Sequence, residues 1–456
     1  MAFDLFIRGG TVVSPQGRTR AHVAVQDGRI AAITLEEHEA HRVIDAEGKY
    51  VLPGVIDPHG HFASRRTFEE SCLIETRRMA AGGVTSYLDF LQAKDGSYIP
   101  RVEQARKFIE QHSVIDMGLH AIVMTRQHVQ ELAAYVKLGV ISFKFYMAAR
   151  GAELYPNTLS VDDGLLYEGL EAIARLGPPA LAMVHAENWE IAWALSDRLK
   201  AAGRTDAAAW SEGKPGLCEE DAMRRATYLA WKLGCPLYIV HIGIGTCREI
   251  LREARGWGAT VYGETCPHYL MVHKDHPMAR IAKYNPAIKL AQDNAGLWEA
   301  LAEGTIQCLG SDHIPGDRVH KFPPGKDGSI WDAVGGVPGS PTILPLMLHG
   351  VSTGRLTLER VVEVTSANAA RILGLYPRKG AIAIGADADL VVVDLSRRVR
   401  FRPELLLSEF SIFDGFEFQG WPVMTILRGT VIMEEGEVVG KNGSGRYLHR
   451  PLGAAT

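Results

Sequence analysis

Residues 51–62 read VLPGVIDPHGHF, an apolar run that ends in two histidines, His59 and His61, with only Gly60 between them. Its valine and isoleucine content predicts a buried strand. In an extended strand, side chains i and i+2 point to the same side, so the two imidazoles face together where the strand ends. Two imidazoles in that arrangement can chelate one cation, and the stretch therefore predicts a metal-ligating strand end.

Short β-branched or aromatic runs recur along the middle of the chain, and helix-compatible stretches such as 67–81, 221–233 and 294–304 separate them. Eight strands alternating with helices predict an α/β fold, a (β/α)8 TIM-type barrel, with its active site at the C-terminal ends of the strands. A doubly wound open sheet is the alternative, but no G-x-G-x-x-G motif follows an early strand. The expected strands are 50–57, 84–90, 117–123, 140–146, 180–185, 236–241, 260–264 and 306–312.

The two ends of the chain follow a different pattern. Residues 5–30 alternate apolar runs with turn signals at 15–17 and 27–28, which is typical of hairpins. The stretches 388–395 and 424–440 repeat this pattern. We expect one small β-sandwich domain formed from both chain termini. The predicted limits are 1–53 for its N-terminal part, 54–376 for the catalytic barrel, and 377–456 for its C-terminal part with an oligomerisation tail.

Composition narrows the function classes. The 456 residues are 46% hydrophobic and 22% charged, with a formal net charge of −4, so no basic surplus favours nucleic acid or an anionic membrane. The sequence contains no run of 18 apolar residues, so it predicts no membrane-spanning helix. The first residues lack the apolar core of a signal peptide. The six scattered cysteines fit a reducing compartment. We expect a cytoplasmic enzyme with no nucleic-acid or membrane partner.

Four further strand ends or strand interiors carry polar residues. Lys144 lies inside the apolar run ISFKFYM, and His185, His241 and Asp312 end three other runs. A charged group in such a run is costly unless it is paired or ligates a metal. Any one of them has a structural explanation, since Lys144 could extend its amine to solvent and Asp312 could cap a helix. Together with the two histidines of the first strand, they predict a metal centre.

The donor types indicate which ions would bind. Four imidazoles with oxygen donors suit Zn²⁺, and Mn²⁺, Co²⁺ or Fe²⁺ fit the same ligands. Six ligands are too many for one catalytic zinc with an open position, which favours two ions. Lys144 could ligate only as a neutral amine or after conversion to an acid, and the residue pattern leaves this choice open.

These residues lie in motifs that resemble the amidohydrolase superfamily, and more closely its cyclic amidase branch of hydantoinases, dihydropyrimidinases and allantoinases. The resemblance runs nearly end to end. Its motifs are PGVIDPHGH (53–61), SFK (142–144), VHAEN (184–188), YGETCPHYL (262–270), GSDH (310–313) and GADADLVVVD (385–394).

The resemblance implies a mechanism and a ligand set. Lys144 would carry a CO2-derived carbamate that bridges two divalent ions, with zinc expected first and Mn²⁺ or Co²⁺ as alternatives. A hydroxide between the ions would attack the amide carbonyl of a small cyclic substrate, and Asp312 would move its proton to the ring nitrogen. The product would be an N-carbamoyl amino acid. The implied ligands are His59, His61 and Asp312 for one ion and His185 and His241 for the other.

The substrate is less well defined by the sequence. Ala149 stands where many dihydropyrimidinases and D-selective hydantoinases have an oxyanion-binding tyrosine, and segment 331–339 resembles allantoinases. Segment 413–423 instead resembles hydantoinases. Allantoinase therefore stays an alternative, whereas dihydroorotase fits worst, because Ala63 replaces its carboxylate-binding arginine.

Candidate substrate contacts come from loops at the strand ends. Asn285, in NPAIK, is expected to hold the ring amide through its backbone, although an Asn-Pro turn is an equal alternative. Phe62 and Tyr155 are candidates for an apolar side-chain pocket. Three loop arginines, Arg65, Arg66 and Arg150, could bind a substrate carboxylate, although loop arginines are more often solvated.

Two other expectations concern assembly and activity. The apolar tail 401–416 and the resemblance imply a homo-oligomer, a tetramer or a dimer. Non-catalytic scaffold proteins resembling dihydropyrimidinase form a remote alternative, but those have lost the metal ligands. All six ligand positions of this chain hold competent residues.

Overall fold

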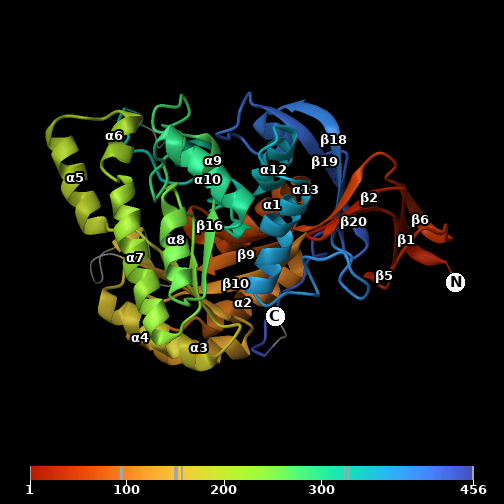
Figure 1. Ribbon diagram of the computed structural model, residues 1–456, viewed down its shortest axis with the longest axis horizontal. Helices are drawn as coiled ribbons and strands as arrows, with labels where there is room; N and C mark the ends of the chain where they lie inside the picture. Colours follow the sequence, from red (N-terminus) through yellow and green to blue (C-terminus); the bar gives the residue numbers. More distant parts are fainter. Residues whose placement is uncertain are drawn as a thin grey trace.

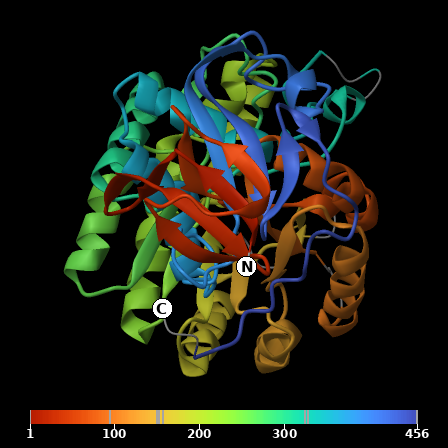
Figure 2. The same ribbon diagram turned by 90° about the vertical axis from the view of Figure 1, so that its right-hand side faces the viewer.

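The computed structural model describes residues 2–92, 96–147, 153–155, 158–322, 325 and 328–453. A barrel wrapped by helices forms one side of the molecule in Figure 1, and a strand-rich domain that includes the N-terminus forms the other. Figure 2 views the molecule from the side of this strand-rich domain, with the barrel behind it. The α/β barrel with a β-sandwich formed from both ends of the chain is confirmed.

Eight parallel strands form the barrel, in the order β17-β16-β15-β14-β11-β10-β9-β8. The sheet closes where Gly60, at the end of β8, bridges His313, just after β17. The His61 backbone N–H donates to the His313 carbonyl at 2.9 Å across this closure. The strands are β8 (Val55–Gly60), β9 (Val84–Leu91), β10 (Asp116–Ile122), β11 (Ser142–Tyr146), β14 (Leu181–His185), β15 (Leu237–Ile239), β16 (Val261–Thr265) and β17 (Cys308–Leu309).

Helices follow the strands and cover the outside of the barrel (Figure 1). The longer ones are α1 (Phe68–Ala81), α2 (Ile99–His112), α3 (Arg126–Lys137), α4 (Asp163–Leu176), α5 (Trp189–Ala201), α7 (Gly216–Leu233), α8 (Cys247–Gly256), α10 (Ala291–Glu303) and α12 (Ile343–Ser352). The shorter ones are α6 (Ala207–Glu212), α9 (Pro267–Met271), α11 (Arg318–Lys321), α13 (Leu358–Val362) and α14 (Asn368–Ile372).

The helix starts reflect local capping. The side chain of Thr67 accepts the Glu70 backbone N–H, and the Glu70 carboxylate accepts the Thr67 N–H, which forms a capping box at the start of α1. The helix expected at 221–233 begins earlier, at Gly216, because Pro215 precedes it with extended backbone and fills the N-cap position.

The strand expected at 50–57 is two strands. β7 (Tyr50–Pro53) pairs with β18 and β2 in the sandwich, and β8 starts the barrel one residue later. Gly54 separates them, and a Cβ added there would lie 2.2 Å from Thr85 Oγ1, so only glycine allows this approach. His59 lies inside β8 and His61 directly follows it, which keeps both at the barrel's C-terminal end.

The sandwich contains a four-stranded sheet, β5-β4-β1-β6, and a seven-stranded sheet, β21-β20-β19-β18-β7-β2-β3. N-terminal β7 pairs antiparallel with C-terminal β18, so the two ends of the chain share one sheet. The strands are β1 (Phe3–Arg8), β2 (Thr11–Ser14), β3 (Gly17–Arg20), β4 (His22–Gln26), β5 (Arg29–Thr34), β6 (Ala40–Asp45), β18 (Leu390–Arg400), β19 (Glu417–Leu427), β20 (Thr430–Glu434) and β21 (Glu437–Val438). The domain limits given above stay predictions.

The predicted turn at residues 27–28 is a two-residue hairpin loop. Gln26 pairs with Arg29 across it, and Asp27 and Gly28 have φ of +52° and +73°. Positive φ at both central residues is the signature of the type I′ turn, whose twist matches that of paired strands.

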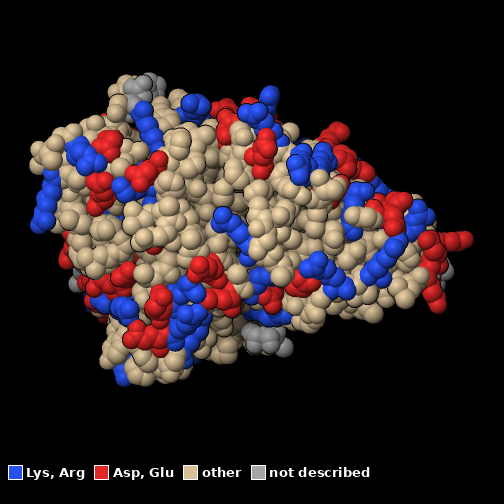
Figure 3. Space-filling view, turned by 45° about the horizontal axis from the view of Figure 1, so that its top comes forward, with Lys and Arg blue, Asp and Glu red and all other residues tan. Residues whose placement is uncertain are grey.

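The surface carries charges of both signs. On the face drawn in Figure 3, basic and acidic side chains are interspersed among uncharged ones. All six cysteines are buried and unpaired. Within the described part of the chain, no helix combines the length and apolarity that crossing a bilayer requires.

Candidate metal centre

The six predicted ligands lie at or near the C-terminal ends of five barrel strands and are all buried. His59 is in β8 and His61 follows it, Lys144 is in β11, His185 ends β14, His241 follows β15, and Asp312 follows β17. Parallel strands of a closed barrel bring their C-terminal ends to one face. Side chains that are far apart in sequence therefore meet there.

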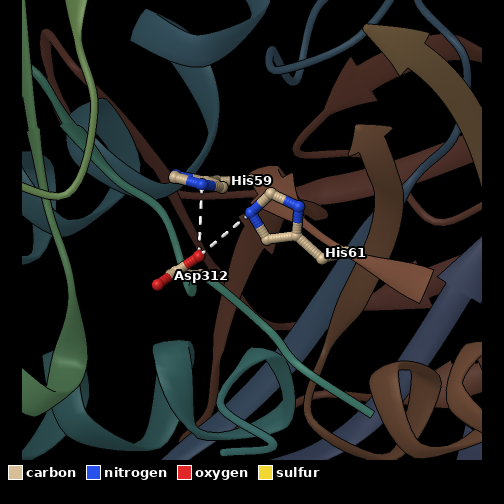
Figure 4. Close-up of side chains that lie close together, drawn as sticks. All are labelled: His59, His61 and Asp312. Atoms are coloured by element: carbon tan, nitrogen blue, oxygen red, sulfur yellow. Dashed lines mark ion pairs between the residues drawn. The ribbon is translucent and has the colours of Figure 1, made fainter. Parts of the chain in front are cut away.

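Asp312 joins the first pair of histidines. Its Oδ1 lies 3.3 Å from His59 Nε2 and 3.2 Å from His61 Nε2, and both rings point toward the carboxylate in Figure 4. His185 Nδ1 and His241 Nε2 lie 2.9 Å apart and form a second pair. The ring centroids of His59 and His241 are 5.2 Å apart, so the two pairs are adjacent.

Lys144 supplies an isolated buried amine. Its side chain is fully buried, and Nζ has no hydrogen-bond partner among the described residues. Nζ lies 4.8 Å from the Phe90 ring centroid and 5.0 Å from that of Tyr146. Burial lowers the pKa of Lys144 to about 7, because a low-dielectric site disfavours the ammonium form. A substantial part of this lysine is therefore a neutral amine near neutral pH.

Two of the predicted ligands have left-handed backbone conformations. His241 has φ of +42° and Asp312 has φ of +48°. Each such conformation costs a non-glycine residue about 1 kcal/mol or more, and such strain clusters at functional sites. Both residues follow the end of a barrel strand and line the same cavity.

Glu264 is a site residue to which the sequence analysis gave no role, although it lies in the quoted motif YGETCPHYL. Its Oε1 lies 2.6 Å from His59 Nδ1, and its carboxyl group accepts bonds from Tyr238 Oη at 2.9 Å and the His241 N–H at 3.0 Å. This contact at Nδ1 leaves His59 Nε2 facing Asp312, as in carboxylate–histidine–metal arrangements. Burial raises the pKa of Glu264 to about 8, and a nearby metal ion would lower it.

His185 is positioned in a similar way from its other ring nitrogen. Trp189 Nε1 donates to His185 Nε2 at 3.3 Å, and Glu187 Oε2 lies 3.4 Å from the same atom. Glu187 pairs in turn with Lys214 at 3.6 Å. These contacts leave Nδ1 facing His241. Glu187 lies in the quoted motif VHAEN, but its position against the ring depends on the fold.

A cavity of about 150 Å³ opens onto four of the six predicted ligands. Asn285, a predicted substrate contact, lines it, and its buried Oδ1 lacks a partner within the described ranges. Tyr155 has no described side chain, and Ala149 and Arg150 lie outside the described residues. The lining comprises His61, Ser64, Arg65, Gln92, Tyr146, His185, His241, Tyr284, Asn285, Asp312, Ile314, Val334, Gly335 and Gly336.

The structure does not bring Phe62 to this cavity. Its side chain is fully buried and stacks on Tyr87 with ring centroids 4.6 Å apart. The chain turns inward directly after His61, so the aromatic ring enters the core beneath the loop. The position of Phe62 in the loop could not show whether its ring faces the cavity or the core.

The donors fit a divalent metal centre. His59 Nε2 and Lys144 Nζ are buried without hydrogen-bond partners among the residues described, and such orphaned atoms are rare and costly in folded proteins. Imidazole nitrogen and carboxylate oxygen are the ligands that Zn²⁺ and related ions prefer. A cation between these groups would satisfy the orphaned atoms.

Comparisons with known proteins agree with this geometry. The model of the amidohydrolase family matches residues 50–432. An L-hydantoinase from Paenarthrobacter aurescens is 35% identical over 98% of both chains, and an allantoinase from Solibacter usitatus is 37% identical over 98% of this chain and 97% of its own. A solved D-hydantoinase structure superposes with a TM-score of 0.91 at 32% identity and covers 99% of this chain and 100% of its own. The likeness thus includes both the barrel and the sandwich.

Proposed function

Because this chain belongs to the amidohydrolase family, and within it to the cyclic amidase branch, we propose that it hydrolyses the ring amide of hydantoins or dihydropyrimidines to N-carbamoyl amino acids. One observation carries the proposal: four of the six expected ligands, His61, His185, His241 and Asp312, line one cavity, and the other two, His59 and Lys144, are buried next to residues of its wall. The chain is thus a metal-dependent cyclic amidase, and the proposal concerns the substrate, the metal and the role of each residue.

The metal centre is proposed to hold two divalent ions, zinc in the first place, with Mn²⁺ or Co²⁺ as alternatives. A carbamate on Lys144 is part of this proposal. The depressed pKa of Lys144 supports it, since only a neutral amine attacks CO2, and the resulting carbamate offers two oxygen ligands. His59, His61 and Asp312 would hold one ion, and the second histidine pair would hold the other.

The reaction assigns distinct tasks to the chain's own groups. When bound, the ions lower the pKa of water to about 7 and polarise the substrate carbonyl. Asp312 would accept a proton at its carboxylate and return it to the departing ring nitrogen. Asn285 would orient the ring amide at the cavity wall. Tyr146 is a candidate oxyanion donor, because it lines the cavity close to Lys144.

Allantoin is the second candidate substrate, and one feature of the cavity favours it. The segment 331–339, which resembles allantoinases, contributes Val334, Gly335 and Gly336 to the wall. An allantoinase is also among the similar proteins. These observations concern substrate choice and leave the reaction type unchanged.

Parallel assays would test the proposal. Metal-loaded protein is offered a 5-substituted hydantoin, dihydrouracil and allantoin, and kcat/KM is compared with that of Lys144→Ala. We expect the hydantoin or dihydrouracil to be preferred and turnover to be lost in the variant. Preference for allantoin would reverse the order of the two substrates. Protein that binds no stoichiometric metal and opens none of the rings would favour the scaffold alternative.

Assembly and location are also proposals. Leu405 and Leu407 are 44% and 45% exposed, and they lie in the tail 401–416 whose other apolar residues are mostly buried. Exposed leucines at this place support packing on a second copy, as a tetramer or dimer in the cytoplasm. Sedimentation velocity of the purified protein would test this, and a monomer at micromolar concentration would contradict it.

A further inference from the structure

Arg65 lies in the cavity wall beside the metal ligands, between the turn after His61 and the start of α1. Its Nη2 donates to the carbonyls of Gly335 and Gly336, the latter at 2.9 Å. Nε and Nη1 are buried and have no hydrogen-bond partner in the described part of the chain. A guanidinium carries five N–H donors, and those on Nε and Nη1 are unused here.

Two buried lysines lie around the same loop. Lys321 Nζ donates to the carbonyls of Gly336 at 3.1 Å and Lys283 at 3.3 Å. Lys283 Nζ donates to three carbonyls in the segment 330–333, at 2.6 to 3.1 Å. Among described residues, no carboxylate oxygen lies within 4.0 Å of a side-chain nitrogen of Arg65, Lys283 or Lys321. Burial lowers the pKa of Lys283 to about 8 and that of Lys321 well below its ordinary value, so the charge on this side of the cavity that persists at neutral pH is that of Arg65.

Arg66, the next residue, shows that the chain can neutralise an arginine at this place. Its Nη1 pairs with Glu75 at 3.2 Å, and its Nη2 pairs with Asp317. Arg65 receives no such partner from the part of the chain that the structure describes, although burying an unpaired charge is expensive. Burial lowers the pKa of Arg65 to about 10, which still leaves it protonated at neutral pH. The loop therefore holds one paired arginine and one whose charge faces the cavity.

We propose that Arg65 is a specificity-determining residue that selects cyclic amides whose ring substituent ends in a carboxylate. The carboxylate would accept charge-assisted hydrogen bonds from the unused donors and neutralise the charge of Arg65. Ser64 and Gln92, which line the same cavity, offer further polar contacts. This inference rests on the proposed function, because it names the substrate class of the same site.

A matched pair of substrates tests it: 5-(carboxymethyl)hydantoin and its primary amide, which has nearly the same shape but no charge. Metal-loaded wild-type protein, Arg65→Gln and Arg65→Lys are compared by kcat and KM. We expect the wild type to prefer the acid by roughly tenfold or more in kcat/KM. Arg65→Gln should lose this preference through a higher KM for the acid, with the amide substrate little affected, and Arg65→Lys should keep part of it.

Two results would overturn the inference while leaving the proposed function intact. One is turnover of the amide with no preference for the acid in the wild type. The other is an equal loss for both substrates in Arg65→Gln, which would mean that Arg65 only anchors the loop at Gly335 and Gly336. Failure of the fully metal-loaded wild type to open either ring, or the rings of the parallel assays, would overturn the proposed function and this inference with it.

Discussion

Two clusters in this molecule each place three metal-competent side chains with ligand atoms within 4.8 Å of one another. The first, here called the histidine cluster, comprises His59, His61 and Asp312. The second, the aspartate cluster, comprises Asp116, Asp387 and Asp389. Both are largely buried, with Asp387 the most exposed member, and by donor spacing alone both are candidate metal sites.

The aspartate cluster is filled by the chain's own cations. Lys379 Nζ lies 2.6 Å from Asp116 and 3.3 Å from Asp387, and it also pairs with Asp389. Arg428 donates to Asp116 as well. Burial alone would lower the pKa of Lys379, but the negative charges of the three surrounding carboxylates outweigh it and raise the pKa above its ordinary value. This cluster ties the barrel strand β10 to the sandwich and needs no metal.

The histidine cluster has the opposite character. Its neighbouring amine, Lys144, makes no ion pair within the described ranges, and two of its members, His61 and Asp312, face a cavity. Burial lowers the pKa of Lys144, whereas that of Lys379 is raised. Donor spacing therefore does not distinguish a metal site from a structural ion-pair network. What distinguishes them is whether the chain supplies the compensating cation.

The largest expected effect is on kcat/KM, which should fall for a substitution in the histidine cluster and stay unchanged for one in the aspartate cluster. Asp312→Asn should lower kcat/KM by about 1000-fold, because an amide can neither accept the proton nor ligate as a carboxylate does. Asp387→Asn, in the aspartate cluster, serves as the control and should retain wild-type kinetics. Steady-state assays with measured metal content check this. Activity of Asp312→Asn within tenfold of wild type would contradict the assignment.

For stability, in contrast to activity, substitutions in the aspartate cluster should have larger effects than substitutions beside the histidine cluster. Lys379→Met should lower the free energy of unfolding by about 3 kcal/mol or more, because it leaves buried carboxylates without their cation. Lys144→Met should leave the metal-free protein as stable or make it more stable, since it removes an unpaired buried amine. Urea unfolding of both variants after chelation measures this. Equal losses in the two variants would show that the lysines have the same role.

A pH effect follows from the opposite shifts of the two lysines. Burial lowers the pKa of Lys144 from 10.5 to about 7. Between these values the unfolded chain binds a proton that the folded metal-free protein does not, so the free energy of unfolding rises with pH in this window. Below pH 7 both states are protonated and the contribution is constant.

This rise should be absent from Lys144→Met, and Lys379 should not contribute to it, because its raised pKa keeps it charged throughout the window. Urea midpoints across the window in CO2-free buffer measure the difference between wild type and Lys144→Met. A difference in urea midpoint between wild type and Lys144→Met that stays constant with pH would contradict the lowered pKa of Lys144.

The smallest effect concerns the outermost member of the aspartate cluster. Asp387 is the most distant of the three from Lys379, at 3.3 Å, and its side chain is partly exposed. Asp387→Asn should cost about 1 kcal/mol, because Lys379 keeps its two closer partners. Thermal unfolding against Lys379→Met measures the ratio of the two effects. A loss as large as that of Lys379→Met would place Asp387 at the centre of the network.

The fold and the donor set could be predicted from sequence because they depend on local pattern. Polar residues that end apolar runs, such as His185, point to barrel strands and to candidate metal ligands together. The prediction of one strand at 50–57 was wrong, because the chain passes from the sandwich sheet to the barrel at Gly54. The apolar pattern continues through this glycine and gives no sign of the change. Apolar periodicity shows that a segment is buried and does not show which sheet buries it.

Long-range contacts could not be predicted in the same way. Glu264 approaches His59 from 205 residues away, and the Arg65 guanidinium finds carbonyls rather than acids 270 residues further on. Phe62 lies in the predicted loop but enters the core. Each of these positions depends on how separate βα units pack, which local patterning does not determine.

The most direct test of the central claim is a crystal structure of zinc-loaded protein with diffraction recorded at the zinc absorption edge. We expect two anomalous peaks beside Asp312, about 2.0 to 2.2 Å from the nitrogens of His59, His61, His185 and His241, with extra density on Lys144 between them. We expect no peak at the aspartate cluster. Zinc bound among Asp116, Asp387 and Asp389, with none beside the four histidines, would contradict it.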